Sequence, residues 1–252
     1  MYKIFQNILL KCYRNFFSKS IYSSKYGLQV FEFLYFNYKS LIEVPEANFL
    51  KNYIPKGGVV IDVGSNIGFF TIKFAKWVGP TGRIVSIEPD DKNFQRLTYY
   101  VMKNNYLDRV ILVKSAVSEK SGQVKFFLNP YNPMDHRISD VGINVRSTTI
   151  DELCSSLQLQ NIDFIKIDVQ GAESLVIDGA RNTLSNLRAV LYLEIENDLY
   201  ENNRVEKLIN DLYSYGYFFY KIHKNRLRLI KNSNEILNII KINGYADFLV
   251  KK

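Results

Sequence analysis

One short stretch constrains the fold more than any other part of the chain: GGVVIDVGSNIGFFTIKFA, which runs from Gly57 to Ala75. An apolar run leads to Asp62, two glycines follow four residues apart, and apolar residues then recur at helical spacing. This order predicts a strand, a tight turn and a helix. Such a unit brings backbone N–H groups close to a ligand at the start of a helix, and a glycine lets the ligand approach.

The spacing of the two glycines bears on the ligand. Gly64 and Gly68 form a Gly-x-x-x-Gly pattern, and Asn66 stands where a further glycine would be. Enzymes that bind dinucleotides instead carry Gly-x-Gly-x-x-Gly around a pyrophosphate. The pattern therefore favours a ligand with a smaller charged tail. A purely structural turn has the same spacing, so the glycines alone do not fix the ligand.

Two acids make the interpretation more specific. Glu88 closes the next apolar run and precedes Pro89, which ends the strand; a carboxylate there accepts two hydrogen bonds from a ribose diol. Asp62 lies near the turn, where it either holds a cationic amino group, directly or through water, or ties down the N–H groups of the turn. Glu88 as a solvated strand end is the structural alternative. Together these acids and the two glycines fit S-adenosylmethionine.

Apolar strands alternate with helical patterns from Leu41 onward. This alternation predicts an α/β fold with a mostly parallel, doubly covered sheet. The expected strands are 59–63, 83–87, 110–115, 164–169, 189–196, 217–223, 226–231 and 245–250. The expected helices are 69–78, 91–104, a short one starting at about 151, 172–184 and 201–215. Residues 122–128 and 142–148 are expected to pair as an inserted hairpin with 129–141 as its loop.

Charged residues interrupt two strands that ought to be buried. In DFIKIDVQGAE, Lys166 and Asp168 alternate with isoleucines, and in AVLYLEIEN, Glu194 and Glu196 alternate with apolar residues. Charges on central strands are costly unless they are paired. Because the carboxyl ends of neighbouring parallel strands form the ligand-binding edge, these side chains are candidates for a second site. A structural network of ion pairs is the alternative.

Metal binding is not the favoured interpretation of these acids. Three carboxylates are able to hold Mg²⁺ or Mn²⁺, but no histidine or further acid stands at a spacing that compels a metal site. Cys12 and Cys154 form neither a disulfide framework nor a metal motif. His136, in the loop NPYNPMDHRISD, is either a general base or substrate clamp or an exposed turn residue.

The net charge of +8 makes an acidic partner conceivable. Residues 1–40 are predicted to form a basic, aromatic helical extension before a domain at 41–252. Within it, residues 1–31 are expected to form a helix that covers the domain, or a helix that contacts an anionic membrane face. With no signal peptide expected, the predicted location is cytoplasmic or peripheral at the inner membrane face. Nucleic acid is not expected as a partner, since the Asn/Asp-Pro-Pro-aromatic signature of many base-methylating enzymes is absent from the sequence.

Several motifs in order resemble the FkbM family of methyltransferases, within the Rossmann-like class that uses S-adenosylmethionine. They are VIDVGSNIGFFT, VGPTGRIVSIEP, VRSTTIDEL, DFIKIDVQGAESLVIDGA and LYLEIE, which cover about 59–196, and the closing YADFLVKK. The resemblance does not extend to the first 40 residues. It implies a seven-stranded sheet with an antiparallel last strand, and methyl transfer to a hydroxyl of a glycan, a lipid-linked sugar or a secondary metabolite.

The resemblance also implies a cofactor site. It does not identify the catalytic residues, which are inferred from the chemistry of the reaction. The residues expected to hold the cofactor are Asp62, Gly64, Ser65, Asn66, Gly68, Thr71, Glu88 and Pro89, with Ser115 and Ala116 beside the adenine. A hydroxyl acceptor must lose its proton. Asp168 is the first candidate for the base, with Lys166 setting its charge state, and Glu194 and His136 follow. The rivals are an NAD-dependent oxidoreductase and a non-catalytic cofactor-binding protein docked at a membrane.

Overall fold

The computed structural model describes residues 48–129, 136–197 and 202–252. The unit discussed below spans Leu50–Lys252. The predicted extension at 1–40, and the membrane contact predicted for 1–31, lie outside the described residues.

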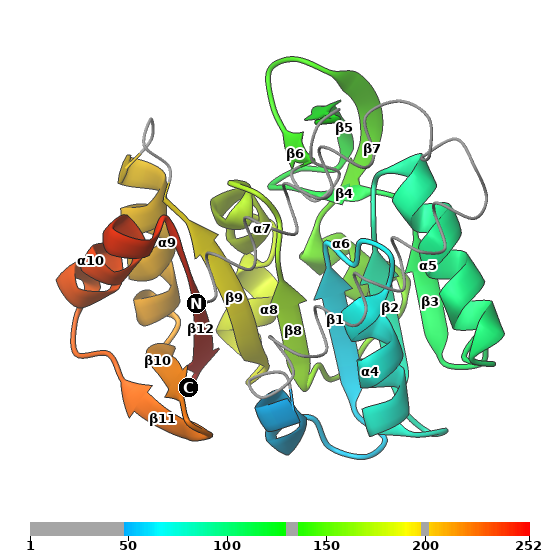
Figure 1. Ribbon diagram of the computed structural model, residues 1–252, viewed down its shortest axis with the longest axis horizontal. Coiled ribbons are helices and arrows are strands. Elements are labelled where there is room, and N and C mark those ends of the chain that lie inside the picture. The colour runs from blue at the N-terminus through cyan, green and yellow to red at the C-terminus, as the bar shows by residue number, and fades with distance from the viewer. Residues whose placement is uncertain (1–47, 130–135, 198–201) are drawn as a thin grey trace, which may run out of the picture. The chain divides into compact units, whose positions relative to one another are not determined.

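The described unit is built on one large twisted sheet (Figure 1). Its strands are β1 (Val59–Val63), β2 (Arg83–Ile87), β3 (Val110–Val113), β8 (Phe164–Ile167), β9 (Val190–Glu196), β10 (Phe218–His223), β11 (Arg226–Leu229) and β12 (Tyr245–Lys251). They lie in the order β11-β10-β12-β9-β8-β1-β2-β3. The strands from β3 to β9 are parallel, whereas β12 runs antiparallel between β9 and β10.

This topology confirms the predicted α/β methyltransferase-like sheet and adds one strand to it. The family resemblance implied seven strands, with the last antiparallel. The last strand, β12, is indeed antiparallel, but the hairpin partner β11 extends the sheet to eight strands within the described residues. The short connection Lys224–Asn225 makes this possible, since both residues have positive φ (48° and 58°), as a two-residue hairpin turn requires.

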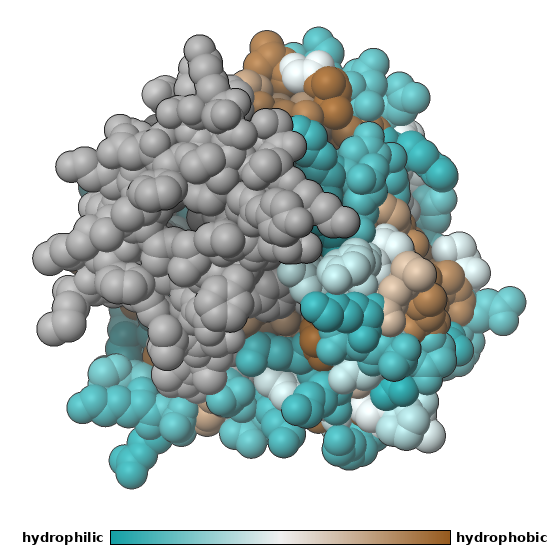
Figure 2. Space-filling model, turned by 45° about the vertical axis from the view of Figure 1, so that its right-hand side comes forward, coloured by the Kyte–Doolittle hydropathy of each residue, from teal (hydrophilic) through white to brown (hydrophobic). Residues whose placement is uncertain are grey.

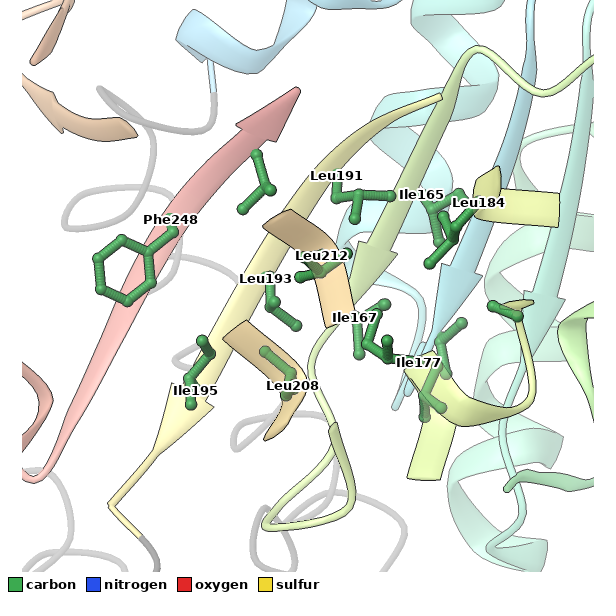
Figure 3. Packing of buried hydrophobic residues seen from close by; sticks show 14 of the residues in the cluster. Ile165, Ile167, Ile177, Leu184, Leu191, Leu193, Ile195, Leu208, Leu212 and Phe248 are labelled. Carbon is green, nitrogen blue, oxygen red and sulfur yellow. The ribbon is translucent and has the colours of Figure 1, made fainter. Parts of the chain in front are cut away.

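Helices cover both faces of the sheet. The helices are α4 (Phe69–Val78), α5 (Asp91–Lys103), α6 (Ile150–Ser156), α7 (Glu173–Asp178), α8 (Arg181–Asn186), α9 (Asn202–Ser214) and α10 (Ser233–Asn243), with a 3₁₀ turn at Lys51–Tyr53. On one face, α4 places Phe70 and Phe74 against Tyr192 and Phe164. On the other, α7, α8 and α9 pack on isoleucines and leucines of β8 and β9 (Figure 3). Alternate residues of each strand thus serve the two faces, as predicted.

The predicted helix at 172–184 is wrong in one respect, because it is two helices. Gly179 lies against the backbone of Ser118, and a Cβ at this glycine would stand 2.2 Å from that carbonyl oxygen. The chain bends there, and α8 restarts with its first amides bonded to Asp151, whose carboxylate accepts from Asn182 and Thr183 (3.0 and 2.8 Å). Asp151 thus caps a helix other than its own.

A helix was also missed, at α10. Asn232 caps it by accepting from the N–H of Glu235, and Gly244 ends it in the left-handed conformation (φ 83°). These are ordinary start and stop signals. The sequence analysis assigned the residues between them to no element.

A second, smaller sheet interrupts the chain between β3 and α6. It contains β4 (Ala116–Val117), β5 (Gly122–Phe127), β6 (Arg137–Ile138) and β7 (Ile143–Thr148), in the order β4-β7-β5-β6. The predicted hairpin is confirmed by the antiparallel pairing of β5 with β7. The loop predicted at 129–141 is wrong in part, because Arg137–Ile138 form β6 and pair with β5. The strand predicted at 110–115 is shorter, since the chain leaves the large sheet after Val113 and joins the small one at Ala116. We call β4–β7 the insertion sheet.

The described surface is mixed in character. In the view of Figure 2, hydrophilic residues cover most of the described surface, with hydrophobic areas near its upper and right-hand edges. Large exposed apolar side chains occur on and just after α5 and in the insertion sheet. No helix among the described residues is both long enough and apolar enough to cross a bilayer.

Replacing Gly179 with alanine tests the helix break. Its φ of −79° is ordinary for any residue, so the penalty comes from the clash with Ser118, at about 3 kcal/mol of unfolding free energy. Gly216→Ala is the control, because Gly216 has a φ of 84° but open space around its Cβ position. It should cost only about 1 kcal/mol. Urea unfolding measures both, and an equal or smaller loss at position 179 would contradict the packing of Gly179 against Ser118.

Candidate functional site

The turn between β1 and α4 has a shape that only glycine permits at its first position. Gly64 has a φ of 73°, and a Cβ on it would lie 2.0 Å from the carbonyl oxygen of Asp168. Gly68 has a φ of 93°, and its Cβ would meet Leu97 Cδ1 at 2.8 Å. Other residues of the protein therefore exclude a side chain at both glycines. The sequence analysis had attributed the need for glycine to the close approach of a ligand.

The backbone amides of this turn are engaged inside the protein. The first two N–H groups of turn 64–68 donate to the carbonyl oxygen of Ile87 (3.1 and 3.0 Å). The N–H of Asn66 donates to Glu88 Oε2 (2.9 Å), and the last two donate to oxygens of the turn itself (2.8 and 2.9 Å). The turn thus offers a ligand its shape and position, while its own amides are already satisfied.

Asn66 occupies a position that demands a left-handed backbone. Its φ is 51°, a region that asparagine tolerates better than most residues other than glycine. This explains why the sequence has asparagine where a further glycine was considered. Its side-chain oxygen also accepts from the N–H of Ile67 (2.8 Å), which stabilises the turn locally.

Glu88 links the turn to the start of α5. One carboxylate oxygen accepts from Asn66, and the other accepts from the N–H of Asp90 (2.9 Å), which in turn caps α5. Glu88 is only 5% exposed, and burial raises its pKa to about 7, although the two amides favour the charged form. The Asn93 side chain also interacts with this carboxylate. A carboxylate has about four acceptor positions, so these donors do not use all of them.

Asp62 lies beneath the turn and is fully buried. Its Oδ2 accepts from Thr71 (2.6 Å), while its Oδ1 has no hydrogen-bond partner among the described residues. Burial raises the pKa of Asp62, and the nearby ammonium of Lys166 opposes that shift. Its side chain is 0% exposed, so Asp62 lies inside the buried network under the turn.

Two other residues expected to touch the cofactor serve the same buried network. The Thr71 hydroxyl lies 2.8 Å from that of Ser86, and Ser86 donates to the Ser65 hydroxyl (2.7 Å). Ser65 donates in turn to the backbone oxygen of Asp62 (2.8 Å). The hydroxyls thus tie β1, β2 and α4 together under the turn.

Lys166 joins the two candidate clusters. Its side chain is 2% exposed, and its Nζ lies 3.0 Å from Asp168 Oδ2 and 3.7 Å from Asp62 Oδ1. The ammonium also stands over the ring of Phe70, 5.0 Å from its centre. Two carboxylates and an aromatic face thus compensate for a buried positive charge. The ion-pair network that the sequence analysis considered as the alternative is present, and it extends to Asp62, which the sequence analysis had assigned to the other cluster.

The carboxyl ends of β8 and β9 carry further acids. Asp168 is 25% exposed, so it lies at the boundary between the buried network and solvent. Glu194 faces Asp247 across the pairing of β9 with β12. Sequence analysis missed Glu173, a buried acid whose pKa is raised well above its usual value by burial and by the charges of Glu196 and Asp168. The available signal for Glu173 in the sequence was its position two residues after Gly171, at the start of a helix.

The remaining predicted residues lie at the margins of the site. Ser115 follows β3, is buried, and donates to the backbone oxygens of Ala116 and Arg146 (3.0 Å each). Pro89 follows Glu88 and is partly exposed. His136 lies just before β6, and its Nδ1 accepts from the N–H of Asn129 (3.0 Å).

A metal site does not emerge from these acids. Within the described ranges, no group of three or more histidine, cysteine, aspartate and glutamate side chains is arranged to hold a metal ion.

The raised pKa of Glu88 predicts a pH dependence of stability. A carboxyl whose pKa rises from 4.5 to about 7 on folding stabilises the protein below pH 4.5 and loses that contribution as pH rises through 7. This loss is about 3 kcal/mol. Glutamine does not titrate, so the unfolding free energy of Glu88→Gln lacks this pH-dependent loss. The variant should therefore become more stable relative to the wild type as pH rises from 4.5 to 7. Parallel pH profiles from urea unfolding would contradict this assignment.

Comparisons with known proteins agree with this architecture. The sequence profile of the methyltransferase FkbM domain matches residues 62–245. The chain is 30% identical over 176 residues to the 2-O-methyltransferase NoeI of Sinorhizobium fredii, a match that covers 61% of this chain and 70% of NoeI. It is 29% identical over 135 residues to the hexuronic acid methyltransferase AglP of Haloferax volcanii, covering 53% of this chain and about half (54%) of AglP.

A solved structure supports the fold alone. A protein of Clostridium thermocellum, described as a candidate rRNA methylase, superposes with a TM-score of 0.50 at 13% identity. The superposition covers 82% of this chain and 93% of that one. The family match decides between the two cofactors considered from the sequence, in favour of S-adenosylmethionine and against a dinucleotide. On this evidence the chain belongs to the FkbM family of S-adenosylmethionine-dependent methyltransferases.

Proposed function

We propose that this enzyme methylates a hydroxyl group of a sugar, in a free glycan or in a glycan linked to a carrier. The observation that carries the proposal is the pair of Lys166 with the partly exposed Asp168, which lies directly against the Gly64 turn. A carboxylate at that place is suited to accept a hydroxyl proton beside the bound cofactor. NoeI and AglP, which match the chain, are a 2-O-methyltransferase and a hexuronic acid methyltransferase.

The cofactor is proposed to lie over the carboxyl ends of β1 and β2. Glu88 retains acceptor capacity for a ribose diol after its two bonds to backbone amides. The shape of turn 64–68 would define the floor of this pocket. Ser115 and Ala116, at the end of β3, are proposed to border the adenine. Asp62, Ser65 and Thr71 would hold the turn in place from below.

The bound cofactor supplies a methyl group that is already activated for transfer, so the protein mainly aligns the acceptor and excludes water. In this proposal, Asp168 accepts the acceptor's proton at its carboxylate. Lys166 keeps Asp168 ionised, because a neighbouring ammonium favours the charged form of a carboxylate. Glu194 remains a second candidate for the base.

His136 is less suited than Asp168 to act as the base. Its Nδ1 already accepts a hydrogen bond from the N–H of Asn129. A neutral imidazole then carries its proton on Nε2, so neither ring nitrogen offers a lone pair for the acceptor's proton. Glu196, at the end of β9, is suited to accept a hydrogen bond from another hydroxyl of a sugar.

A transfer assay tests the proposed function. The protein is incubated with S-adenosylmethionine labelled on its methyl group and with a panel of saccharides, each paired with its fully O-acetylated form as a control. Label should enter at least one saccharide with free hydroxyls and none of the acetylated forms, because acetylation removes the acceptor oxygens. Tight cofactor binding without transfer to any saccharide would reject a sugar as the acceptor.

Replacing Asp168 with asparagine tests the base. The substitution keeps the shape but removes the proton acceptor, so kcat should fall about 100-fold or more, while calorimetry shows unchanged cofactor affinity. Asp108→Asn is the matched control, because Asp108 is an exposed acid just before β3 that pairs locally with Arg109. Full turnover in Asp168→Asn would transfer the role to another residue, with Glu194 the next to be replaced.

A further inference from the structure

The insertion sheet stands beside the proposed site, and the proposed reaction gives no role to its basic residues. The chain passes from β3 through Lys114 and Ser115 into β4, so this sheet begins where the carboxyl edge of the large sheet ends. Figure 1 shows it beyond the carboxyl ends of β8, β1 and β2. A ligand that extends outward from the proposed acceptor site would therefore meet the insertion sheet.

The two faces of this sheet differ in chemistry. The strand register puts Val124 opposite Val145 and Phe126 opposite Ile143, which makes one face apolar. The alternate residues form the other face, which contains Gln123, Lys125, Phe127, Arg137, Asn144 and Arg146. We call this second set the cationic face.

Three basic residues are neighbours on the cationic face. Arg146 pairs in register with Gln123, two residues before Lys125, and Arg137 pairs with Phe127, two residues after it. The three basic residues are thus diagonal neighbours across three strands, and all three are exposed. Strands β5, β6 and β7 contain no acidic residue within their described ranges.

One end of the cationic face is fixed next to the proposed cofactor site. The Ser115 hydroxyl, buried at the end of β3, donates to the backbone oxygen of Arg146 (3.0 Å). The pairing of Ala116 with Ser147 holds the same strand beside β4. The row of charge therefore starts at Arg146 and runs outward to Lys125 and Arg137. At the outer end lies Phe127, an aromatic ring of the kind that packs against the apolar face of a sugar.

We propose that the cationic face binds an anionic group of the acceptor, either a phosphate or a carboxylate, while the hydroxyl to be methylated lies at Asp168. This inference rests on the proposed function and specifies its substrate class as an anionic glycan. Exposed basic residues attract such a group mainly through charge, so the interaction should weaken with salt.

Binding of small probes tests the inference independently of turnover. The protein is first saturated with S-adenosylhomocysteine and then titrated by calorimetry with glucose 1-phosphate, methyl glucuronide and methyl glucoside. At least one anionic probe should bind more tightly than the neutral glucoside. Whichever anionic probe is preferred identifies phosphate or carboxylate as the source of the charge.

Paired double variants assign the preference to the cationic face. Lys125→Gln with Arg146→Gln should weaken binding of the preferred anionic probe about fivefold and leave the glucoside unaffected, as expected for two exposed ion pairs. Lys231→Gln with Lys241→Gln removes the same charge from exposed positions of another region and should change nothing. No anionic preference, or equal losses in the two double variants, would overturn the inference.

Failure of the proposed function has a separate signature. If no saccharide of the panel accepts methyl label from a protein that binds S-adenosylmethionine, the sugar hydroxyl is rejected as acceptor. If neutral and anionic saccharides are methylated with equal KM, the function holds and the cationic face is rejected as its anion site.

Discussion

The ammonium of Lys166 is shared between carboxylates on either side of it, and the geometry of the site depends on that arrangement. Lys166 lies on β8, Asp62 on the adjacent β1 and Asp168 just beyond the end of β8. A charge buried this deeply is tolerated only with partners, and breaking such a pair typically costs about 3–5 kcal/mol. The ammonium thus fixes the relation between the strand that leads into the glycine turn and the acid that faces solvent.

Much of this site was accessible from the sequence because its chemistry conflicts with its place in the fold. Lysine and aspartate on a central parallel strand are costly, so their presence in the sequence indicates pairing and function. The strand–turn–helix unit from β1 to α4 was equally clear, since its apolar pattern and its glycines agree. In both cases the residues that gave the signal lie next to one another in the sequence.

Other features depend on contacts between distant residues and were missed for that reason. Glu173 has an ordinary place at a helix start, and only the approach of Glu196 and Asp168 makes its burial unusual. The break between α7 and α8 follows from the passage of Ser118 against Gly179. The amides of turn 64–68 were expected to serve a ligand, yet the carbonyl of Ile87 and the carboxylate of Glu88 accept hydrogen bonds from the first three of them. Pairings of this kind are not encoded in local periodicity.

The contact between Gly64 and Asp168 has a consequence for how such a site changes over time. The carbonyl oxygen of Asp168 occupies the space where a side chain at position 64 would begin. Any gain of a side chain at that glycine would push the neighbouring strand end aside, together with its carboxylate. The conformation of the glycine turn and the position of the Asp168 carboxylate therefore cannot change independently of each other.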